Sequence, residues 1–165
     1  MVEAKPVVLC GRSPQIASSV KKGLEPEYEG VLLSILSSPR SSNLASVIHI
    51  ILSPAAGVSD IPAILQGQSP SSTEENIGTQ NYSNLPIAVV TGGGYDDRLF
   101  KEMYDAAKGK GKAVHWLRPD LSVQTPPLGP DYGKHMVGRV KACLERLEGE
   151  GKLGEEKGEG EVVMF

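Results

Sequence analysis

The chain has few aromatic residues, few cysteines and no long apolar run, and each shortage excludes a class of protein. Aromatic residues make up 5% of the 165 positions, so aliphatic side chains must build the core. Two cysteines are too few for a disulfide framework, and we expect two buried thiols in a reducing compartment. Every apolar run is far shorter than the roughly 20 residues that span a bilayer. With no secretory signal at its start, the chain is expected to be cytoplasmic.

The chain also has no excess of positive charge. The net charge is −3, and residues 149–165, with five glutamates and two lysines, hold all of it. A neutral body offers no basic face to nucleic acid or to an anionic membrane, so we expect neither as a partner. Because the acidic segment is rich in glycine and has little to bury, residues 149–165 are predicted to be a disordered tail behind one domain, residues 1–148.

Strand and helix patterns alternate through residues 1–148. Short β-branched runs predict buried strands, and capped amphipathic stretches predict helices between them. We expect strands at 7–10, 47–52, 86–91 and 113–117, and helices at 14–22, 60–66, 97–108 and from 130 to about 147. This order predicts an α/β fold, a Rossmann-like three-layer sandwich around a small parallel sheet of about four strands in the order 2-1-3-4.

Two polar stretches interrupt this pattern. Residues 30–46 are rich in serine and contain another strand-like run, 31–36, which competes with 47–52 for the second strand. We predict that 30–46 is an insertion and that 47–52 is the true strand. Residues 67–85 form a long polar loop, which together with the loop 124–129 could cover a substrate pocket.

Two glycine-bearing turns follow the first and third expected strands, and each opens a helix. They are formed by Gly11, Arg12 and Ser13, and by Thr91, Gly92, Gly93 and Gly94. In the order 2-1-3-4 these turns are neighbours at the switch point of the sheet, where open α/β sheets bind ligands. Backbone N–H groups at a helix N-terminus suit a phosphate, and Arg12 can add a bidentate contact. The alternative is that the glycines only permit tight turns and that Arg12 is solvated.

No established nucleotide motif completes these turns. The G-x-G-x-x-G fingerprint and the P-loop pattern are both absent. No acid that would bind a ribose 2′-hydroxyl follows the second strand, where Ser53 and Pro54 stand, and this favours a phosphorylated ribose paired with Arg12. We therefore expect an oxidoreductase-like protein that binds NADP(H). The alternative is a non-catalytic module that binds a small ligand or a partner chain in the same crevice, and a homodimer could cover the sheet edges.

Other catalytic patterns are incomplete. Tyr104 and Lys108 have the Tyr-x-x-x-Lys spacing of short-chain reductases, but they follow the glycine-rich turn within the same helix, where a reductase has them one helix later. Cys10 precedes a helix N-terminus, yet the Cys-x5-Arg pattern of phosphatases fails because Ile16 stands at the arginine position. His135, in the first turn of the last helix, is a further candidate functional group. No metal-site spacing occurs among the histidines and cysteines.

Six short segments carry further motifs, among them Pro26-Glu27-Tyr28-Glu29, and they occupy residues 26–29, 48–54, 61–65, 89–97, 116–120 and 126–133. Together they resemble a group of small fungal proteins with a Rossmann-like NAD(P)-binding-type domain. The resemblance covers most of residues 5–148 and implies the same α/β fold, but it carries no activity to any residue of this chain. In that group the first motif passes straight into the strand, which is a second reason to regard 30–46 as an insertion, such as retained intron sequence.

Overall fold

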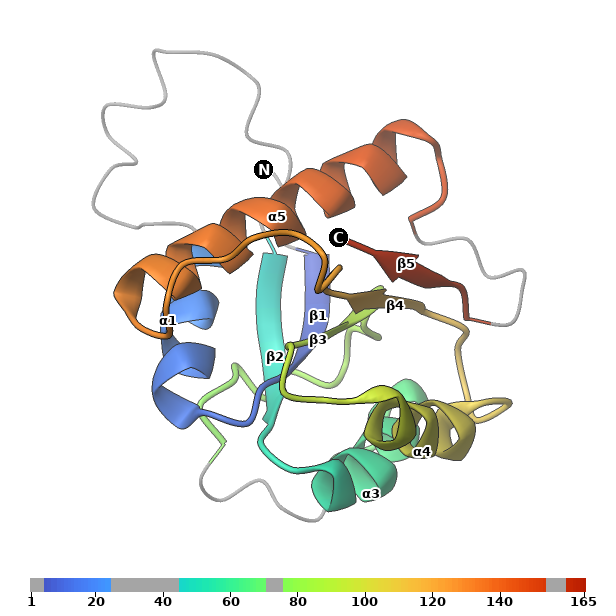
Figure 1. Cartoon of the computed structure of the whole chain (residues 1–165). Helices are drawn as coiled ribbons and strands as arrows, with labels where there is room; N and C mark the ends of the chain where they lie inside the picture. Colours follow the sequence, from blue (N-terminus) through green and yellow to red (C-terminus); the bar gives the residue numbers. More distant parts are fainter. Residues whose placement is uncertain (1–4, 25–44, 71–75, 154–159) are drawn as a thin grey trace, which may run out of the picture.

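Five parallel strands form one sheet in the computed structural model, which describes residues 5–24, 45–70, 76–153 and 160–165 (Figure 1). The strands are β1 (Lys5–Cys10), β2 (Ala45–Ile51), β3 (Ala88–Thr91), β4 (His115–Arg118) and β5 (Val162–Met164). They are hydrogen-bonded in the order β2-β1-β3-β4-β5, and every neighbouring pair is parallel. This is a doubly wound order with its switch point between β1 and β3.

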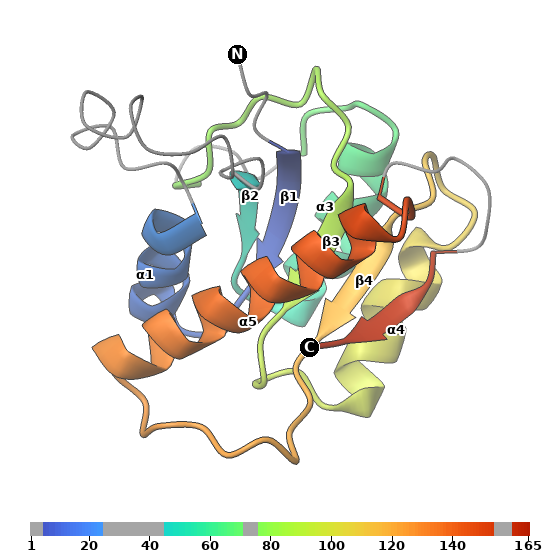
Figure 2. The same cartoon turned by 90° about the horizontal axis from the view of Figure 1, so that it is seen from above.

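Helices cover both faces of the sheet. On one face lie α1 (Pro14–Leu24) and α5 (Pro130–Gly149), and on the other lie α3 (Pro54–Leu65) and α4 (Asp97–Ala107) (Figures 1 and 2). The predicted Rossmann-like three-layer α/β sandwich is therefore confirmed, as is the predicted order of its first four strands.

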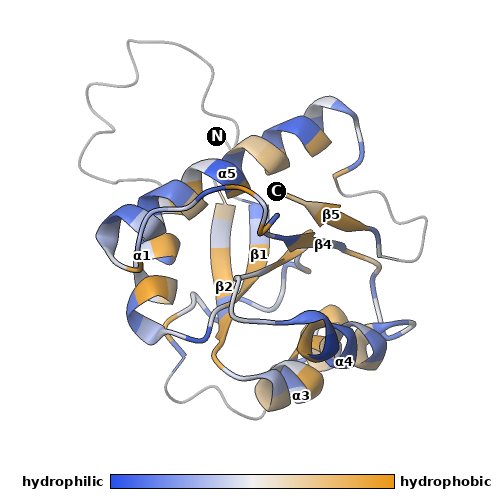
Figure 3. Cartoon of the chain, viewed as in Figure 1, coloured by the Kyte–Doolittle hydropathy of each residue, from blue (hydrophilic) through white to orange (hydrophobic). Residues whose placement is uncertain are grey.

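The core is divided by the sheet into two aliphatic layers. Val7 and Leu9 of β1 point into the layer beneath α1 and α5, whereas Val8 and Cys10 point into the layer beneath α3 and α4. From Val7 to Cys10 both faces of β1 are buried, so this part of the strand is continuously apolar and lacks the alternation of a half-exposed strand (Figure 3). All four of the buried aromatic side chains among the described residues, Tyr82, Tyr95, Phe100 and Trp116, lie in the second layer.

Local capping sets where the helices begin. Ser13 accepts a hydrogen bond from the Ile16 amide at 3.4 Å, directly before Pro14 at the first position of α1. Ser53 caps α3 in the same way through the Ala56 amide, at 3.2 Å. The predicted helix 60–66 is therefore too short, because the Ser-Pro pair already starts α3 at Pro54. Pro62 lies inside α3 without ending it.

The second strand lies close to its predicted position. β2 begins at Ala45, where Lys5 and Ala45 are paired, so the last two residues of the proposed insertion 30–46 belong to the strand. The remainder of that segment, and the competing run 31–36, lie outside the described residues.

A fifth strand joins the sheet beyond the roughly four that the sequence predicts, and at residues 162–164 it contradicts the prediction of a disordered tail over residues 149–165. Val162, Val163 and Met164 pair with Trp116, Leu117 and Arg118 of β4. These three apolar residues follow an acidic run, and they pair with backbone groups of β4 that would otherwise lie at the edge of the sheet. The average composition of residues 149–165 is acidic and glycine-rich, so it does not indicate a strand. Among the described helices, none is both long and apolar enough to cross a membrane.

Candidate functional site

The glycine-bearing turns after β1 and β3 lie side by side at the carboxyl end of the sheet. The two strands are neighbours, and Cys10 is paired with Thr91. A Cβ atom built on Gly94 would lie 3.1 Å from the Cδ atom of Arg12, and one built on Gly92 would lie 3.9 Å from the Cα atom of Gly11. The stem of Arg12 therefore passes directly over Gly94, and a side chain at position 94 would press against it.

A cavity of about 180 Å³ opens between the two turns. All seven residues of the turns line it. The rest of its wall is mostly apolar and includes Leu9, Ile16, Val20, Val90, Met136 and Val140. Because an apolar cavity of about 150 Å³ in another protein holds one benzene molecule, this cavity has room for a single six-membered ring.

The backbone amides of the two turns fall into two groups. The Gly11 amide donates to the carbonyl of Ile51 at 2.9 Å, and the Gly92 amide donates to that of Cys10 at 2.8 Å. These two bonds continue the sheet and tie the turns to it. Within the described parts of the chain, the amides of four other residues of the two turns form no hydrogen bond: Arg12, Ser13, Gly93 and Gly94. Those four amides are the ones available to an anion.

The two helix starts differ in the charge they leave for a ligand. At α4, Asp96 accepts the Leu99 amide at 2.8 Å, and Asp97 forms an ion pair with Arg118 at 2.9 Å. These two carboxylates already compensate the positive end of the α4 dipole. The first turn of α1 contains no acidic residue, so the positive end beside Arg12 and Ser13 remains for an anion.

The hydroxyl of Thr91 is engaged within the sheet. Its Oγ1 atom donates to the carbonyl of Leu117 at 3.0 Å, and the residue is 1% exposed. This bond links β3 to β4 and holds the base of the turn. Thr91 therefore contributes wall area to the cavity, while its hydroxyl already has a partner.

Helix α5 supplies one wall, which the sequence analysis did not assign to the site. Tyr132, Met136 and Val140 stand four residues apart on α5 and all line the cavity. A Cβ atom built on Gly93 would lie 3.5 Å from the hydroxyl oxygen of Tyr132, which therefore lies at the edge of the turn. The spacing is visible in the sequence, but only the packing of α5 against α1 shows which turns that helix face reaches.

Two segments outside the helices complete the cavity. Leu128 belongs to the loop 124–129 that was expected to cover a pocket, and it lines the cavity although 77% of it is exposed. Phe165 follows β5, and its amide donates to the Arg118 carbonyl at 2.8 Å. Arg139 donates to the carbonyl oxygens of Asp120 and Phe165, and its guanidinium lies 5.5 Å from the centre of the Phe165 ring. These contacts hold Phe165 in the cavity wall.

The described lining residues contain no carboxylate and no imidazole. Cys10 is completely buried, and this burial raises the pKa of its thiol far above the usual range, so the thiol stays protonated and is no nucleophile. His135 does not line the cavity, although Tyr132 and Met136 on the same helix do. In the parts of the chain that the structure describes, no cluster of His, Cys, Asp and Glu side chains is suited to hold a metal ion.

Tyr104 and Lys108 lie away from this cavity. Tyr104 is near the end of α4, and its hydroxyl donates to the carbonyl of Gly160 at 2.8 Å. Both residues line a different cavity, which lies at the amino-terminal ends of the strands. Trp116 lines that cavity too. The Tyr-x-x-x-Lys spacing therefore does not form a reductase site beside the glycine-bearing turns.

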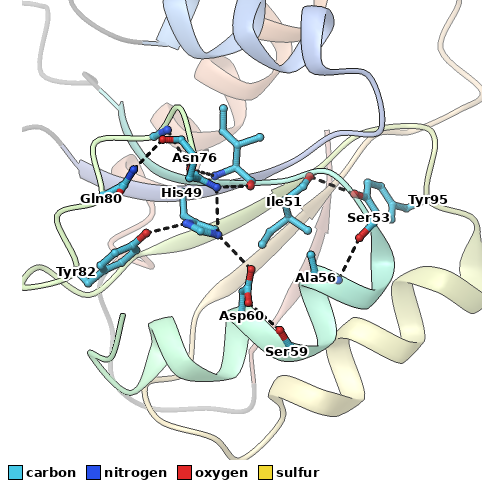
Figure 4. A network of polar contacts seen from close by, with 12 residues as sticks. His49, Ile51, Ser53, Ala56, Ser59, Asp60, Asn76, Gln80, Tyr82 and Tyr95 are labelled. Carbon is cyan, nitrogen blue, oxygen red and sulfur yellow. Dashed lines mark hydrogen bonds and ion pairs between the residues drawn. The ribbon is translucent and has the colours of Figure 1, made fainter. Parts of the chain in front are cut away.

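A buried polar network joins β2, α3 and the segment that follows residue 75 (Figure 4). His49 Nδ1 lies 2.8 Å from the Tyr82 hydroxyl, and His49 Nε2 lies 3.4 Å from Asp60 Oδ2. The Ser59 hydroxyl donates to the other carboxylate oxygen of Asp60 at 2.7 Å. Asn76 Nδ2 also lies 3.3 Å from Nε2. Because a carboxylate only accepts and the Asn76 amide already donates to the Ile50 carbonyl, we assign the imidazole proton to Nε2, which leaves Nδ1 to accept the Tyr82 hydroxyl.

The same segment also pairs with the outer edge of β2. The side chain of Asn76 accepts the Ile50 amide at 3.0 Å and donates to the Ile50 carbonyl at 2.8 Å, as a neighbouring strand would (Figure 4). The amides of Thr79 and Gln80 donate to the carbonyls of Val47 and Ile48. The described part of the loop 67–85 therefore covers the β2 edge, and none of its residues lines the strand-end cavity.

Burial sets the protonation of this network. Desolvation lowers the pKa of His49, and the hydrogen bond and charge of Asp60 only partly oppose this shift. Burial, together with the negative charge of Asp60, raises the pKa of Tyr82. His49 and Asp60 are 1% and 2% exposed, so no substrate reaches them. The role of the network is therefore structural: it holds the residues that follow position 75 against β2 and α3.

Comparisons with known proteins identify a fungal relative. No protein-family model matches the chain, and no solved structure matches it. Kojic acid related protein 6 of Aspergillus oryzae (strain ATCC 42149 / RIB 40) is 37% identical over 147 residues, which cover 86% of this chain and 77% of that protein. The chain therefore belongs to the family of the fungal Kojic acid related protein 6.

Proposed function

We propose that this protein binds a small ligand with one ring and one anionic group in the cavity between β1 and β3. The ring would enter the apolar cavity of about 180 Å³. The anion would bind at the rim, to the guanidinium of Arg12 and to the amides of Ser13, Gly93 and Gly94 at the positive end of α1. The observation that carries this proposal is that residues with unbonded amides line an apolar cavity of the size of one ring.

NADP(H) is the first candidate ligand, which would make the protein oxidoreductase-like. The cavity occupies the switch point at which doubly wound sheets bind nucleotides. At the end of β2, Ser53 caps α3 where an acid would select an unphosphorylated ribose. A dinucleotide is far larger than the cavity, so the nicotinamide ring alone would enter, and the phosphates would lie along the rim beside Arg12.

A non-catalytic small-ligand protein is the second candidate, and the lining favours it. Among the described lining residues, the ionisable side chains are those of Cys10, Arg12 and Tyr132, so catalytic acid–base groups are scarce. The name of the Aspergillus relative refers to kojic acid, a compound with a single six-membered ring. A free ring of that size fits the cavity without the remainder of a nucleotide.

Thermal unfolding of the full chain with NADPH, NADH, FMN, ATP or kojic acid tests these candidates. For NADP(H), we expect NADPH to raise the melting temperature more than NADH does, and Arg12→Ala to abolish the increase. Arg98→Ala is the matched control, because Arg98 is an exposed arginine on α4 that pairs with Glu102 on the same helix. Stabilisation by kojic acid alone supports the second candidate, and stabilisation by none of the five compounds contradicts both.

A further inference from the structure

The two edges of the sheet differ in how they are covered. At the β2 edge, the amides of Thr79 and Gln80 and the side chain of Asn76 bond to backbone groups of the strand. At the other edge lies β5, which is hydrogen-bonded to β4 on one side, and no described residue pairs with its outer side (Figures 1 and 2). An uncovered edge strand is a template for pairing with another chain.

The backbone groups that β5 leaves free belong to Val162 and Met164. The carbonyl of Glu161 and the amide of Phe165 both bond to β4, each at 2.8 Å. Because successive residues of a strand direct their N–H and C=O groups to opposite sides, those of Val162 and Met164 point away from β4. Within the described ranges of the chain, no hydrogen bond reaches these groups.

The side chains of the same two residues are apolar and exposed. Val162 is 41% exposed and Met164 is 49% exposed, whereas Val163 between them is 9% exposed. Val162 is paired with Trp116, so Val162 and Met164 face the side of the sheet on which α3 and α4 lie. The strand contains neither a charged residue nor a proline, which are the residues that usually protect an edge.

We infer that β5 pairs antiparallel with β5 of a second copy of this chain, about a two-fold axis at Val163. In this register Val162 of each copy lies opposite Met164 of the other. Because both residues have outward backbone groups, each such pair exchanges both of its N–H···O=C bonds. The same pairs bring an exposed valine against an exposed methionine. Backbone and side chains are therefore self-complementary about one axis, as a closed dimer requires.

The charges beside β5 favour a second copy over an unrelated strand. In the antiparallel register, Glu161 would lie opposite Phe165 of the other copy. The Arg139 guanidinium lies 5.5 Å from the centre of the Phe165 ring, so each glutamate would come close to an arginine across the interface. The glutamates of the two copies would meanwhile stand at opposite ends of the paired strands, where they do not repel each other.

Sedimentation velocity of the full chain, from about 1 µM to about 1 mM, tests this inference. A strand of three residues gives an interface below the roughly 1,200 Å² of stable complexes. We therefore expect a weak dimer, with an average mass that rises with concentration from that of one chain toward that of two.

A charge swap on β5 tests the register. Val162→Lys combined with Met164→Lys places like charges opposite each other and should weaken association by about tenfold. Val162→Lys combined with Met164→Glu is the matched control, because the same register brings opposite charges together. This second variant should associate more tightly than the first, although it carries as many charges on the same strand.

Hydrogen exchange of the unmodified chain, in dilute and in concentrated solution, removes any dependence on how the variants fold. The amides of Val162 and Met164 should exchange more slowly in the concentrated solution, because a second copy would cover them. The Phe165 amide donates to β4 within one copy, so its exchange should depend far less on concentration.

Three outcomes would overturn the inference. A mass of one chain at every concentration would show that a second copy is not the occupant, and that another chain or the shortness of β5 protects the edge. Equal association of the two double variants would exclude this register. Exchange of the Met164 amide that does not depend on concentration would place any dimer contact on another surface.

Discussion

The Nε2 atom of His49 lies 3.4 Å from the Oδ2 atom of Asp60, and both residues are almost completely buried. A neutral imidazole satisfies this arrangement, since Nε2 donates to the carboxylate and Nδ1 accepts the Tyr82 hydroxyl. A second proton on Nδ1 would remove that acceptor. The residues after position 75 therefore depend on the protonation state of a histidine in β2.

Stability should fall as the pH falls below about 6.5, the pKa of histidine in an unfolded chain. Burial lowers the pKa of His49 in the folded protein, so in this window the unfolded chain binds a proton that the folded protein does not. The stabilising contribution is thus complete above the unfolded pKa and declines toward the lower folded pKa. Urea unfolding at pH 7.5, 6.5 and 5.5 measures this slope. In His49→Gln the slope should be shallower, and an equal slope in both proteins would contradict the assignment.

Asn76→Ala should destabilise the protein by about 1–3 kcal/mol, because both backbone groups of Ile50 would lose their partner at the edge of β2. Asn81→Ala is the control, since Asn81 is exposed and its side chain accepts from the neighbouring Ser83. Hydrogen exchange provides a second measurement. The Ile50 amide should exchange faster in Asn76→Ala, and unchanged exchange would show that water replaces the side chain without cost.

Arg139→Gln should loosen β5, since the guanidinium holds the carbonyl oxygens of Asp120 and Phe165 together. We expect a loss of about 1–3 kcal/mol in the free energy of unfolding. Arg98→Ala, which removes an exposed pair within α4, should change it by less than about 0.5 kcal/mol. Faster exchange of the Phe165 amide would place the effect at β5. Equal stability losses in the two variants would instead show that Arg139 contributes no more than a surface charge.

Alanine substitutions at Gly109 and Gly111 allow the cost of backbone strain to be measured apart from the cost of steric overlap. Both have a φ angle of +72°, so alanine at either position should cost about 1–2 kcal/mol in thermal unfolding. Among the described residues beyond its own chain neighbours, none has an atom within 4 Å of a Cβ atom on Gly109, whereas a Cβ atom on Gly111 would overlap the backbone of Leu65. Gly111→Ala should therefore lower the free energy of unfolding by about 1–3 kcal/mol more than Gly109→Ala does. Equal effects would show that the end of α3 moves aside freely.

Local patterns along the chain were sufficient to predict the elements around the candidate site. The apolar run before Gly11 predicts the end of β1, the Ser13-Pro14 pair predicts the start of α1, and Asp96 predicts the start of α4. These predictions hold because capping and burial act within a few residues. The alternation of these elements then predicts the order of the first four strands. The adjacency of the two glycine-bearing turns follows from that order alone.

Only the tertiary structure decided which distant residues close the cavities. Phe165 reaches the strand-end cavity because three apolar residues complete the edge of β4, and the acidic composition around them suggests a tail. Asn76 and His49 meet because a polar loop pairs with the edge of β2. Such contacts join residues far apart in the chain, and their stability depends on partners that no local pattern specifies. The sequence by itself therefore determined the layers and the switch point, while packing at the sheet edges determined the walls of the sites.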